Sequence, residues 1–408
     1  MTSTLRVSLN NQPIGTLTRL PSGNTFFAFS EDYLATAPAT RPVLSQSFIK
    51  PSGELIPESR ATSGKLPPFF SNLLPEGTMR DYLAKRGGIK PGNEFGLLEL
   101  LGQDLSGAVQ VTAETGAASD SSPESEAHTE PLHALRFSLA GVQLKFSAIA
   151  GKNSRLTIPA SGMGGDWIVK LPAQNYPHVP ENEFAMMDLA GRIGIPVPEV
   201  KLINLADIGN LPEMGLLSGT RALAVSRFDR AAHGQRIHIE DFAQVYAIAP
   251  ENKYEGVSMD TLAGMVWTLT GEAGLTDFIR RVTYILLIGN GDMHLKNWSL
   301  IYRDGITPAL APAYDMLSTV PYLPEDELSL KLAGQRSMRA INADHFRKLA
   351  RKAGVPERLV IKTVRETVEA TRTAWAQHGQ HYDLPTEIRA TIEKHMATSS
   401  LANTSTGE

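Results

Sequence analysis

The chain has 408 residues, of which 42% are hydrophobic and 20% charged, as in a globular protein of roughly two or three domains. Its net charge of −4 argues against a general nucleic-acid binder, which usually carries a basic surface. The lack of cysteine excludes disulfides, thiolate catalysis and cysteine-ligated zinc. The first residues show no apolar stretch of ~7–15 residues like that of a signal peptide, and no segment approaches the ~20 apolar residues that cross a bilayer. We therefore expect a cytoplasmic protein with no membrane partner.

Residues 1–111 are predicted to form a small α+β unit. Alternation of polar and apolar residues predicts strands at Leu5–Leu9, Ile14–Leu20 and Thr25–Phe29. Asn10 and Asn11 are typical turn residues between the first two strands. Phe95–Leu101 is dense in leucine and predicts a short buried helix.

Residues 112–130 mark the clearest predicted domain boundary. They include five acidic residues but no lysine, arginine or large apolar side chain. Such a run cannot bury enough surface to offset the entropy lost on ordering, so it predicts a flexible acidic linker. A regulatory phosphorylation site in the linker is the alternative. Residues 397–408 are small and polar, and we expect a flexible tail.

The remaining residues divide into two predicted lobes. Residues 131–250 alternate strands with one good helix, and residues 251–396 are mostly helical. An irregular stretch at 289–330 interrupts the helical part.

The strongest chemical signal lies in this irregular stretch. Asp292 and Asn297 are separated by four residues, the spacing of the Asp-x-x-x-x-Asn catalytic loop of protein kinases. In such a loop the carboxylate accepts a proton from the attacking hydroxyl and the amide oxygen helps to hold magnesium. A predicted hairpin at 298–311 is followed by Asp315, where a kinase carries its second metal-binding aspartate. The alternative is that these side chains cap turns and that Asp315 caps a helix beginning at Met316.

Lys170 ends a predicted strand of apolar residues, Trp167–Leu171. A lysine in such company needs an anion if it is buried, and it is placed like the strand lysine that holds ATP phosphates. It could instead extend to solvent from an edge strand. Glu183, in the first turn of the following predicted helix, could pair with Lys170 or simply favour the helix dipole.

The segment Phe137–Lys145 combines small residues with polar ones and suits a loop whose backbone amides approach phosphate. It holds one glycine, so it is neither G-x-G-x-x-G nor a Walker A loop, and an ordinary turn is the alternative.

Together these motifs resemble the HipA family of bacterial toxin serine/threonine kinases, over roughly residues 4–390. The segments that carry the resemblance are Phe70–Gly77, Gly102–Val109, Ser138–Lys145, Trp167–Pro172, Asn182–Phe184, Ala224–Arg230, Ile239–Gln244, Gly291–Ser299 and Pro312–Ser318. The resemblance implies a bilobal, protein-kinase-like fold of the α+β class, with a small N-terminal α+β subdomain and a mainly helical C-lobe.

The resemblance also implies roles by position. Asp292 would be the catalytic base, and Asn297 and Asp315 would hold Mg2+. The residues expected to bind ATP are Lys170, the phosphate loop Ala140, Gly141, Val142, Gln143, Leu144 and Lys145, the adenine-facing hinge Glu240, Asp241 and Phe242, and His294 and Tyr314. Ser138 matches a serine that family members autophosphorylate, which ejects the loop and silences the kinase. A second serine found two positions later in some relatives is Ala140 here.

Three further positions have two interpretations each. Arg227–Arg230 fits a family motif, but an ion-pair cluster at a strand end is the simpler explanation. His294 is better placed to orient the loop by hydrogen bonding than to act as a base. Lys296 either neutralises the transferring phosphate or faces solvent.

The family implies a growth-arresting toxin that phosphorylates a translation-related protein, often an aminoacyl-tRNA synthetase. It also implies a helix-turn-helix antitoxin, so that DNA would be contacted mainly indirectly. Two alternatives remain open. The chain could phosphorylate a small molecule or a lipid head group at the same site, or it could be a catalytically silent module that binds a repressor.

Overall fold

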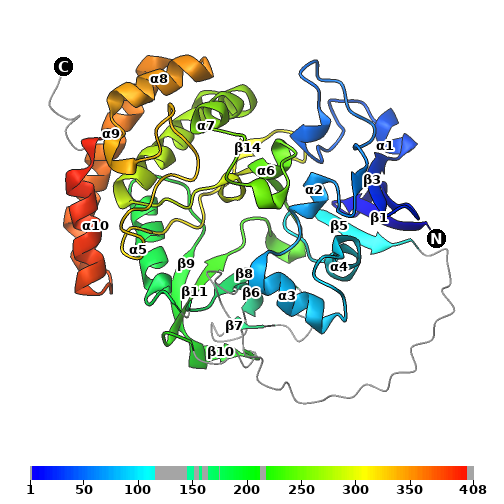
Figure 1. Cartoon of the computed structure of the whole chain (residues 1–408), viewed down its shortest axis with the longest axis horizontal. Helices are drawn as coiled ribbons and strands as arrows, with labels where there is room; N and C mark the ends of the chain where they lie inside the picture. The colour runs from blue at the N-terminus through cyan, green and yellow to red at the C-terminus, as the bar shows by residue number, and fades with distance from the viewer. Residues whose placement is uncertain are drawn as a thin grey trace.

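The computed structural model describes residues 2–114, 145–150, 156–158, 164–173, 175–211 and 217–401. Ser138, the loop residues Ala140–Leu144 and most of the predicted linker lie outside the described residues. Figure 1 shows the N-terminal unit on one side of the molecule and α8, α9 and α10 on the opposite side. No helix among the described residues has the length and apolar character needed to cross a bilayer.

The N-terminal unit is a sheet with helices beside it. Its strands are β1 (Ser3–Leu9), β2 (Gln12–Arg19), β3 (Asn24–Phe29), β4 (Thr62–Ser63) and β5 (Val109–Ala113), in the order β4-β3-β2-β1-β5. Leu5, Val7 and Leu9 alternate into the core of this unit, as the sequence pattern predicts. Asn10 and Asn11 both have positive φ, which suits the tight antiparallel turn from β1 to β2.

Four helices belong to this part of the chain: α1 (Glu31–Ala35), α2 (Pro68–Ser71), α3 (Gly77–Arg86) and α4 (Glu94–Leu101). α4 confirms the helix expected at Phe95–Leu101 and buries Phe95 in the N-terminal core. α3 behaves differently, because Tyr82 packs against Phe146 in the core of the second sheet. The chain between α2 and α3 therefore crosses from one core to the other.

The second sheet has the strand order β10-β7-β6-β8-β11-β9. These strands are β6 (Lys145–Ala150), β7 (Leu156–Thr157), β8 (Trp167–Lys170), β9 (Val200–Asn204), β10 (Ile208–Gly209) and β11 (Arg221–Ser226). In β8, Trp167 and Val169 point into the core of this sheet, so Ile168 and Lys170 face the other side. α5 (Val179–Arg192) contacts β9 and β11.

The third sheet, β12-β13-β14, lies on the helical part of the molecule. Its strands are β12 (His238–Asp241), β13 (Ser299–Tyr302) and β14 (Ala309–Leu310), and α6 (Phe242–Val245) follows β12 directly. The hairpin predicted at 298–311 is present, although its second strand is short. β12 and α6 come from the segment 131–250, yet Phe242 packs in the large core of the helices.

The helical part contains α7 (Met259–Ile288), α8 (Ala343–Ala353), α9 (Glu357–His378) and α10 (Thr386–Thr398). α7 contacts α8, α9 and α10, and its buried face supplies much of the large core. Short 3-10 helices occur at Gln46–Phe48, Leu205–Asp207, Ala232–Gly234, Pro250–Asn252, Leu295–Asn297, Met338–Ala340 and Gly379–His381. The central position of α7 fixes the loop that follows its C-terminus.

A buried ionic cluster joins the N-terminal unit to the end of β11. Asp229 pairs with Arg227 and Arg230, each at 2.8 Å, and accepts the backbone N–H of Gly107 at 2.8 Å. Arg230 also reaches Asp104 at 3.0 Å. The ion-pair cluster expected at Arg227–Arg230 is therefore present, and it holds two units of the fold together.

Gly289 ends α7 in the left-handed conformation (φ 70°), and a Cβ there would lie 2.7 Å from Val320. Gly354 ends α8 with a similar φ of 66°, but a Cβ there would meet nothing within 4 Å. We expect Gly354→Ala to lower the free energy of unfolding by about 1–2 kcal/mol through backbone strain alone. Gly289→Ala should lower the free energy of unfolding by about 1–3 kcal/mol more than Gly354→Ala does, because its added Cβ clashes with Val320. Urea denaturation of both variants measures the difference, and equal losses would contradict it.

Candidate active site

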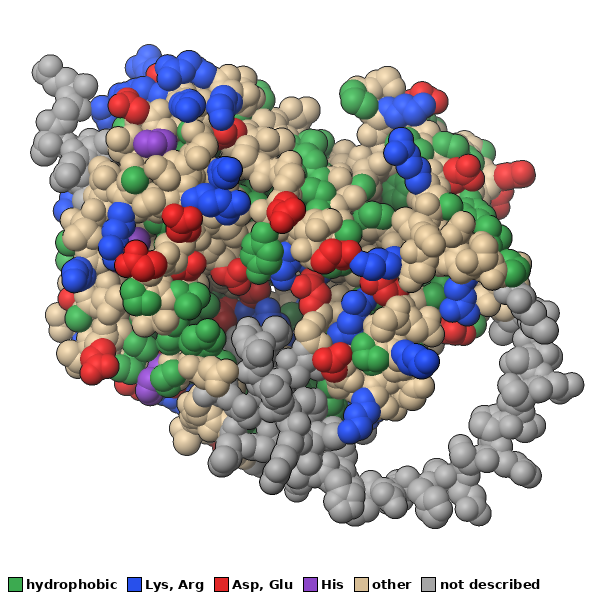
Figure 2. Space-filling view, viewed as in Figure 1, with side chains coloured by type: hydrophobic (Ala, Val, Ile, Leu, Met, Phe, Trp, Pro, Cys, Tyr) green, Lys and Arg blue, Asp and Glu red, His purple; other side chains and the backbone are tan. Residues whose placement is uncertain are grey.

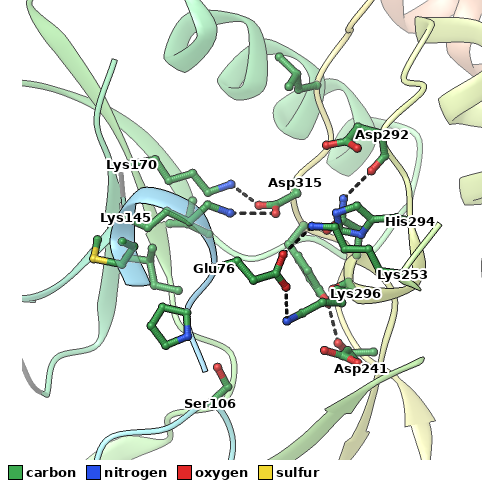
Figure 3. Close-up of a pocket in the computed structure, with 18 of the residues that line it drawn as sticks. Glu76, Ser106, Lys145, Lys170, Asp241, Lys253, Asp292, His294, Lys296 and Asp315 are labelled. Carbon is green, nitrogen blue, oxygen red and sulfur yellow. Dashed lines mark hydrogen bonds and ion pairs between the residues drawn. The ribbon is translucent and has the colours of Figure 1, made fainter. Parts of the chain in front are cut away.

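A cavity of about 1490 Å3 lies where the three parts of the chain meet. Small-molecule sites are typically ~300–1,000 Å3, so this one has room for a large ligand. Figure 2 shows a hollow near the centre of the molecule with acidic and basic side chains around it. Its walls include Glu76 before α3, Lys170 of β8, Asp241 of β12, and Asp292 and Asp315 from the irregular stretch (Figure 3).

Lys170 is the buried cation of the site, with 4% of its surface exposed. Its Nζ contacts both Glu183 of α5 and Asp315. Burial alone would lower the pKa of Lys170, but Asp315 and Glu183 outweigh that effect and raise it above its usual value. The expected pairing of Lys170 with Glu183 is therefore seen in the geometry, and Lys170 is not an edge-strand lysine directed to solvent.

A second lysine shares the same anion. Lys145 pairs directly with Lys170 across β6 and β8, so both side chains project from one face of the sheet. Lys145 Nζ lies 3.0 Å from Asp315, whose pKa burial alone would raise. The two lysines instead hold that pKa well below its usual range. Asp315 is thus ionised at neutral pH and faces two cations.

The backbone around Asp315 is fixed by α5. Asp315 has a φ of 54°, which is uncommon for a residue other than glycine, and it does not cap a helix. Asn182 of α5 donates to the carbonyl of Ser318 at 2.9 Å and accepts from the N–H of Ser318 at 3.1 Å. These two hydrogen bonds attach the segment after β14 to the helix that carries Glu183.

Asp292 and Asn297 lie together in the loop after α7. The N–H of Asp292 donates to the side chain of Asn290 at 3.1 Å. The side-chain amide of Asn297 donates to the carbonyl of Asp292 at 2.8 Å, which leaves its oxygen for another partner. These bonds fix the backbone of Asp292 and the side chain of Asn297 in one turn that lines the cavity.

The carboxylate of Asp292 is accessible from the cavity. Partial desolvation by the surrounding protein raises its pKa above the usual value, while a hydrogen bond from Tyr254 (3.2 Å) and the charge of Lys253 oppose this. His294 packs edge-on against Tyr254, with ring centroids 5.1 Å apart. Burial lowers the pKa of His294 to about 3, so its ring is neutral. Its Nδ1 is buried without a hydrogen-bond partner in the part of the chain that the structure describes.

Lys296 does not face solvent. Its Nζ lies 2.6 Å from Glu76, and the other oxygen of Glu76 lies 2.8 Å from Lys253. Sequence reasoning missed Glu76, Lys253 and Tyr254. The segment Phe70–Gly77 belongs to the family resemblance, yet its composition gives no sign that Glu76 reaches the loop after α7.

The residues of the expected hinge point in different directions. Glu240 is fully buried away from the cavity, where it accepts from Tyr302 (2.5 Å) and from the N–H of Gln46 (3.1 Å). Asp241 lines the cavity and caps α6, and Phe242 lies in the large core. Of the three expected hinge residues, Asp241 therefore lines the cavity, whereas the side chains of Glu240 and Phe242 are buried elsewhere.

Tyr314 lines the cavity, but its hydroxyl group is engaged. It donates to the carbonyl of Lys296 at 2.9 Å and contacts Ser299 at 2.6 Å. Tyr314 therefore both stabilises the loop through Lys296 and lines the cavity.

The donor set fits a phosphate-bearing ligand with a hard metal ion. Asp315 and the free amide oxygen of Asn297 are oxygen ligands of the kind that Mg2+ prefers. Lys170 and Lys145 offer cations to phosphate oxygens, and the unpartnered Nδ1 of His294 offers a further polar contact. The residues present therefore suit a metal–nucleotide complex.

Glu240 predicts a dependence of stability on pH. Burial raises its pKa to about 7, against its usual 4.5, although hydrogen bonds to its carboxylate oppose the shift. Between these values the unfolded chain releases the proton first, so this group makes the fold less stable as pH rises from about 4.5 to 7. Glu240→Gln should therefore gain unfolding free energy relative to the parent over that window, by up to about 3 kcal/mol.

Chemical denaturation at several pH values measures this effect. Glu369→Gln removes the same charge from the exposed face of α9 and serves as the control. A constant difference between Glu240→Gln and the parent from pH 4.5 to 8 would contradict the assignment.

The chain is similar to known proteins over most of its length. The HipA N-terminal domain matches residues 5–112, and the HipA-like C-terminal domain matches residues 137–375. A Sinorhizobium fredii protein named "Putative kinase Y4dM" is 49% identical over 97% of this chain and 96% of its own length. The "Serine/threonine-protein kinase toxin HipA" of Shewanella oneidensis is 25% identical over 89% of this chain and 86% of its own. The solved complex of Shewanella oneidensis MR-1 HipA with HipB and operator DNA matches with a TM-score of 0.73 and 22% identity, covering 97% of this chain and 96% of that chain. The predicted α+β, kinase-like fold is confirmed, and the chain belongs to the HipA family.

Proposed function

We propose that this protein is an ATP- and Mg2+-dependent kinase that transfers the γ-phosphate to a serine or threonine hydroxyl of a protein. The observation that carries the proposal is the buried Lys170, held between Glu183 and Asp315 in the cavity that also contains Asp292 and Asn297. This is the set of groups that phosphoryl transfer requires, namely a phosphate-binding cation with its helix partner, two oxygen ligands for metal and a base.

Each side chain has a defined task in this proposal. Mg-ATP supplies the phosphoryl group, and the ion neutralises the charge that develops on it. Asp292 orients the acceptor hydroxyl, whose oxygen forms the new bond to the γ-phosphorus as the bond to the bridging oxygen of ADP breaks. The hydroxyl proton passes to Asp292, whose raised pKa makes it a better proton acceptor than an ordinary aspartate.

The other groups bind and neutralise. Lys170 and Lys145 contact phosphate oxygens, Glu183 keeps Lys170 in place, and Asn297 and Asp315 provide the metal ligands. Catalysis then comes from positioning and charge neutralisation rather than from a covalent enzyme intermediate.

The biological setting proposed here rests on the relatives. The Shewanella oneidensis relative is named a serine/threonine-protein kinase toxin, which supports a toxin-type kinase. From the family resemblance we further propose that its target is a translation-related protein such as an aminoacyl-tRNA synthetase. The solved toxin–antitoxin complex of HipA with HipB and operator DNA supports an antitoxin as partner. From the family resemblance we propose that this antitoxin is of the helix-turn-helix class. The net charge of −4 favours DNA contact through that partner. Autophosphorylation at Ser138, outside the described residues, is proposed as the silencing step.

Asp292→Asn tests the function most simply. The amide keeps the shape of the side chain but cannot accept the proton, so we expect phosphate transfer to fall by about 100-fold or more. Transfer is measured from labelled Mg-ATP to lysate proteins and by intact-mass spectrometry of the chain itself, with the modified residue mapped. Asp81→Asn, on the exposed face of α3, is the matched control and should behave like the parent.

The alternatives give different results in the same assay. Transfer to metabolites or lipids but not to proteins would favour a small-molecule kinase. An Asp292→Asn variant as active as the parent would contradict the assigned base. No transfer by the parent to any acceptor would contradict the proposed function.

A further inference from the structure

The short segment between α2 and α3 reaches into the candidate active site. Glu76 lies at its end, immediately before α3, and its carboxylate lies between two lysines of the helical part (Figure 3). One oxygen is 2.8 Å from Lys253 and the other is 2.6 Å from Lys296. Lys296 stands between Asp292 and Asn297 in the sequence, so Glu76 holds the loop that carries both.

The surroundings show that this contact is built into the fold. Lys296 also donates to the backbone carbonyl of Asn72 at 3.1 Å. The side chain of Asn72 in turn donates to the carbonyl of Ile248 at 2.8 Å, and Gln244 donates to the carbonyl of Phe69 at 3.0 Å. The N-terminal segment is therefore fixed against residues 244–253 by backbone as well as side-chain contacts.

The same contact extends to Asp292. Lys253 is followed by Tyr254, whose hydroxyl donates to Asp292 at 3.2 Å, and the carbonyl of Lys253 accepts the N–H of Leu295 at 3.2 Å. Movement of Lys253 would therefore shift both a hydrogen-bond donor to Asp292 and the backbone of the loop. Glu76 is placed to restrain all of these groups at once.

The charges also point to a function in the reaction. Burial alone would raise the pKa of Glu76, but Lys296 and Lys253 lower it to about 2, so the carboxylate stays ionised at neutral pH. Glu76 therefore pairs with both lysines next to the loop that carries Asp292. Lys296 has three N–H donors, and the described residues provide two acceptors, Glu76 and the carbonyl of Asn72. One donor is left for a phosphate oxygen.

We propose that Glu76 is a positioning residue for phosphoryl transfer, which holds Lys296 toward the transferring phosphate and Lys253 and Tyr254 beside Asp292. This inference rests on the proposed kinase function and extends it, because it makes the N-terminal unit part of the catalytic machinery. A kinase-like site in this protein is then complete only when the segment between α2 and α3 is docked.

The test is steady-state kinetics of the full-length Glu76→Gln variant, with ADP production measured as a function of Mg-ATP. We expect kcat to fall about tenfold or more, because a misplaced group near the reacting atoms has effects of that order. KM for ATP should change less than about threefold, because Lys170 and Asp315 bind the nucleotide independently of Glu76. Glu76→Asp keeps the charge with a shorter reach and should recover part of the rate.

The pH profile separates positioning from a merely structural role. The charged and titratable groups that face Asp292 are Tyr254, Lys253, Asp315 and Asp326. Lys253 and the hydrogen bond from Tyr254 both lower the pKa of Asp292, and Glu76→Gln removes the contact that holds them beside it. The acidic limb of the kcat/KM profile should therefore move to higher pH in Glu76→Gln. Glu99→Gln, on the exposed face of α4, is the control and should match the parent.

The kinetics of Glu76→Gln can overturn the positioning role of Glu76 in two ways. Glu76→Gln with the kcat and acidic limb of the parent, or with a higher kcat, would overturn the inference while the kinase function stands. A loss of rate that comes with a lower melting temperature, a raised KM and an unmoved acidic limb would show a structural role only, and would also overturn it. If neither the parent nor Glu99→Gln transfers phosphate, the proposed function fails and this inference fails with it.

Discussion

A lysine ammonium group cannot be buried stably without an anion, and Lys170 contacts two carboxyl groups. They come from different parts of the chain, Glu183 from α5 and Asp315 from the segment after β14. Because each of these groups offsets the cost of burying the others, the strand, the helix and the loop are held together in one arrangement. The cation of Lys145, paired with Lys170 across the sheet, strengthens the requirement for Asp315 at this place.

The rest of the site is organised around this arrangement. Asn182, the neighbour of Glu183, hydrogen-bonds to the backbone of Ser318, so α5 fixes the segment that carries Asp315. The C-terminus of α7 then delivers Asp292 to the same cavity, through a glycine that accepts the left-handed conformation needed for the sharp exit. The hydroxyl of Tyr314, one residue before Asp315, donates to the carbonyl of Lys296 and so fixes the loop that carries Asp292 and Asn297.

Sequence reasoning was effective where chemistry is local. Asp292 and Asn297 are five positions apart, and a turn of that length brings them together without help from distant residues. The strand–helix order around Lys170 and Glu183 is likewise local, since 13 positions separate them. The alternation of β1 and the leucines of α4 identify the N-terminal core because burial imposes a simple period on the sequence.

The contacts that sequence reasoning missed are those that depend on how separate cores are docked. Glu76 lies 220 positions before Lys296, and no periodicity links them. The predicted hinge Glu240–Phe242 assumes that three consecutive residues all face the adenine. A strand alternates its faces, so the side chain of Glu240 points away from the cavity that Asp241 lines. The assignments for Ser138 and Ala140–Leu144 remain predictions, because these residues lie outside the described part of the chain.

The proposed function requires that Lys170, Glu183 and Asp315 form a nucleotide-binding site. The most direct measurement is a crystal structure of the protein with Mg2+ and a non-hydrolysable ATP analogue. The account predicts that Lys170 stays on Glu183 and contacts a phosphate oxygen, while Asp315 and Asn297 coordinate the metal and Asp292 faces the γ-phosphate. A nucleotide bound elsewhere, or phosphates that leave Lys170 and Asp315 paired as they are here, would contradict it.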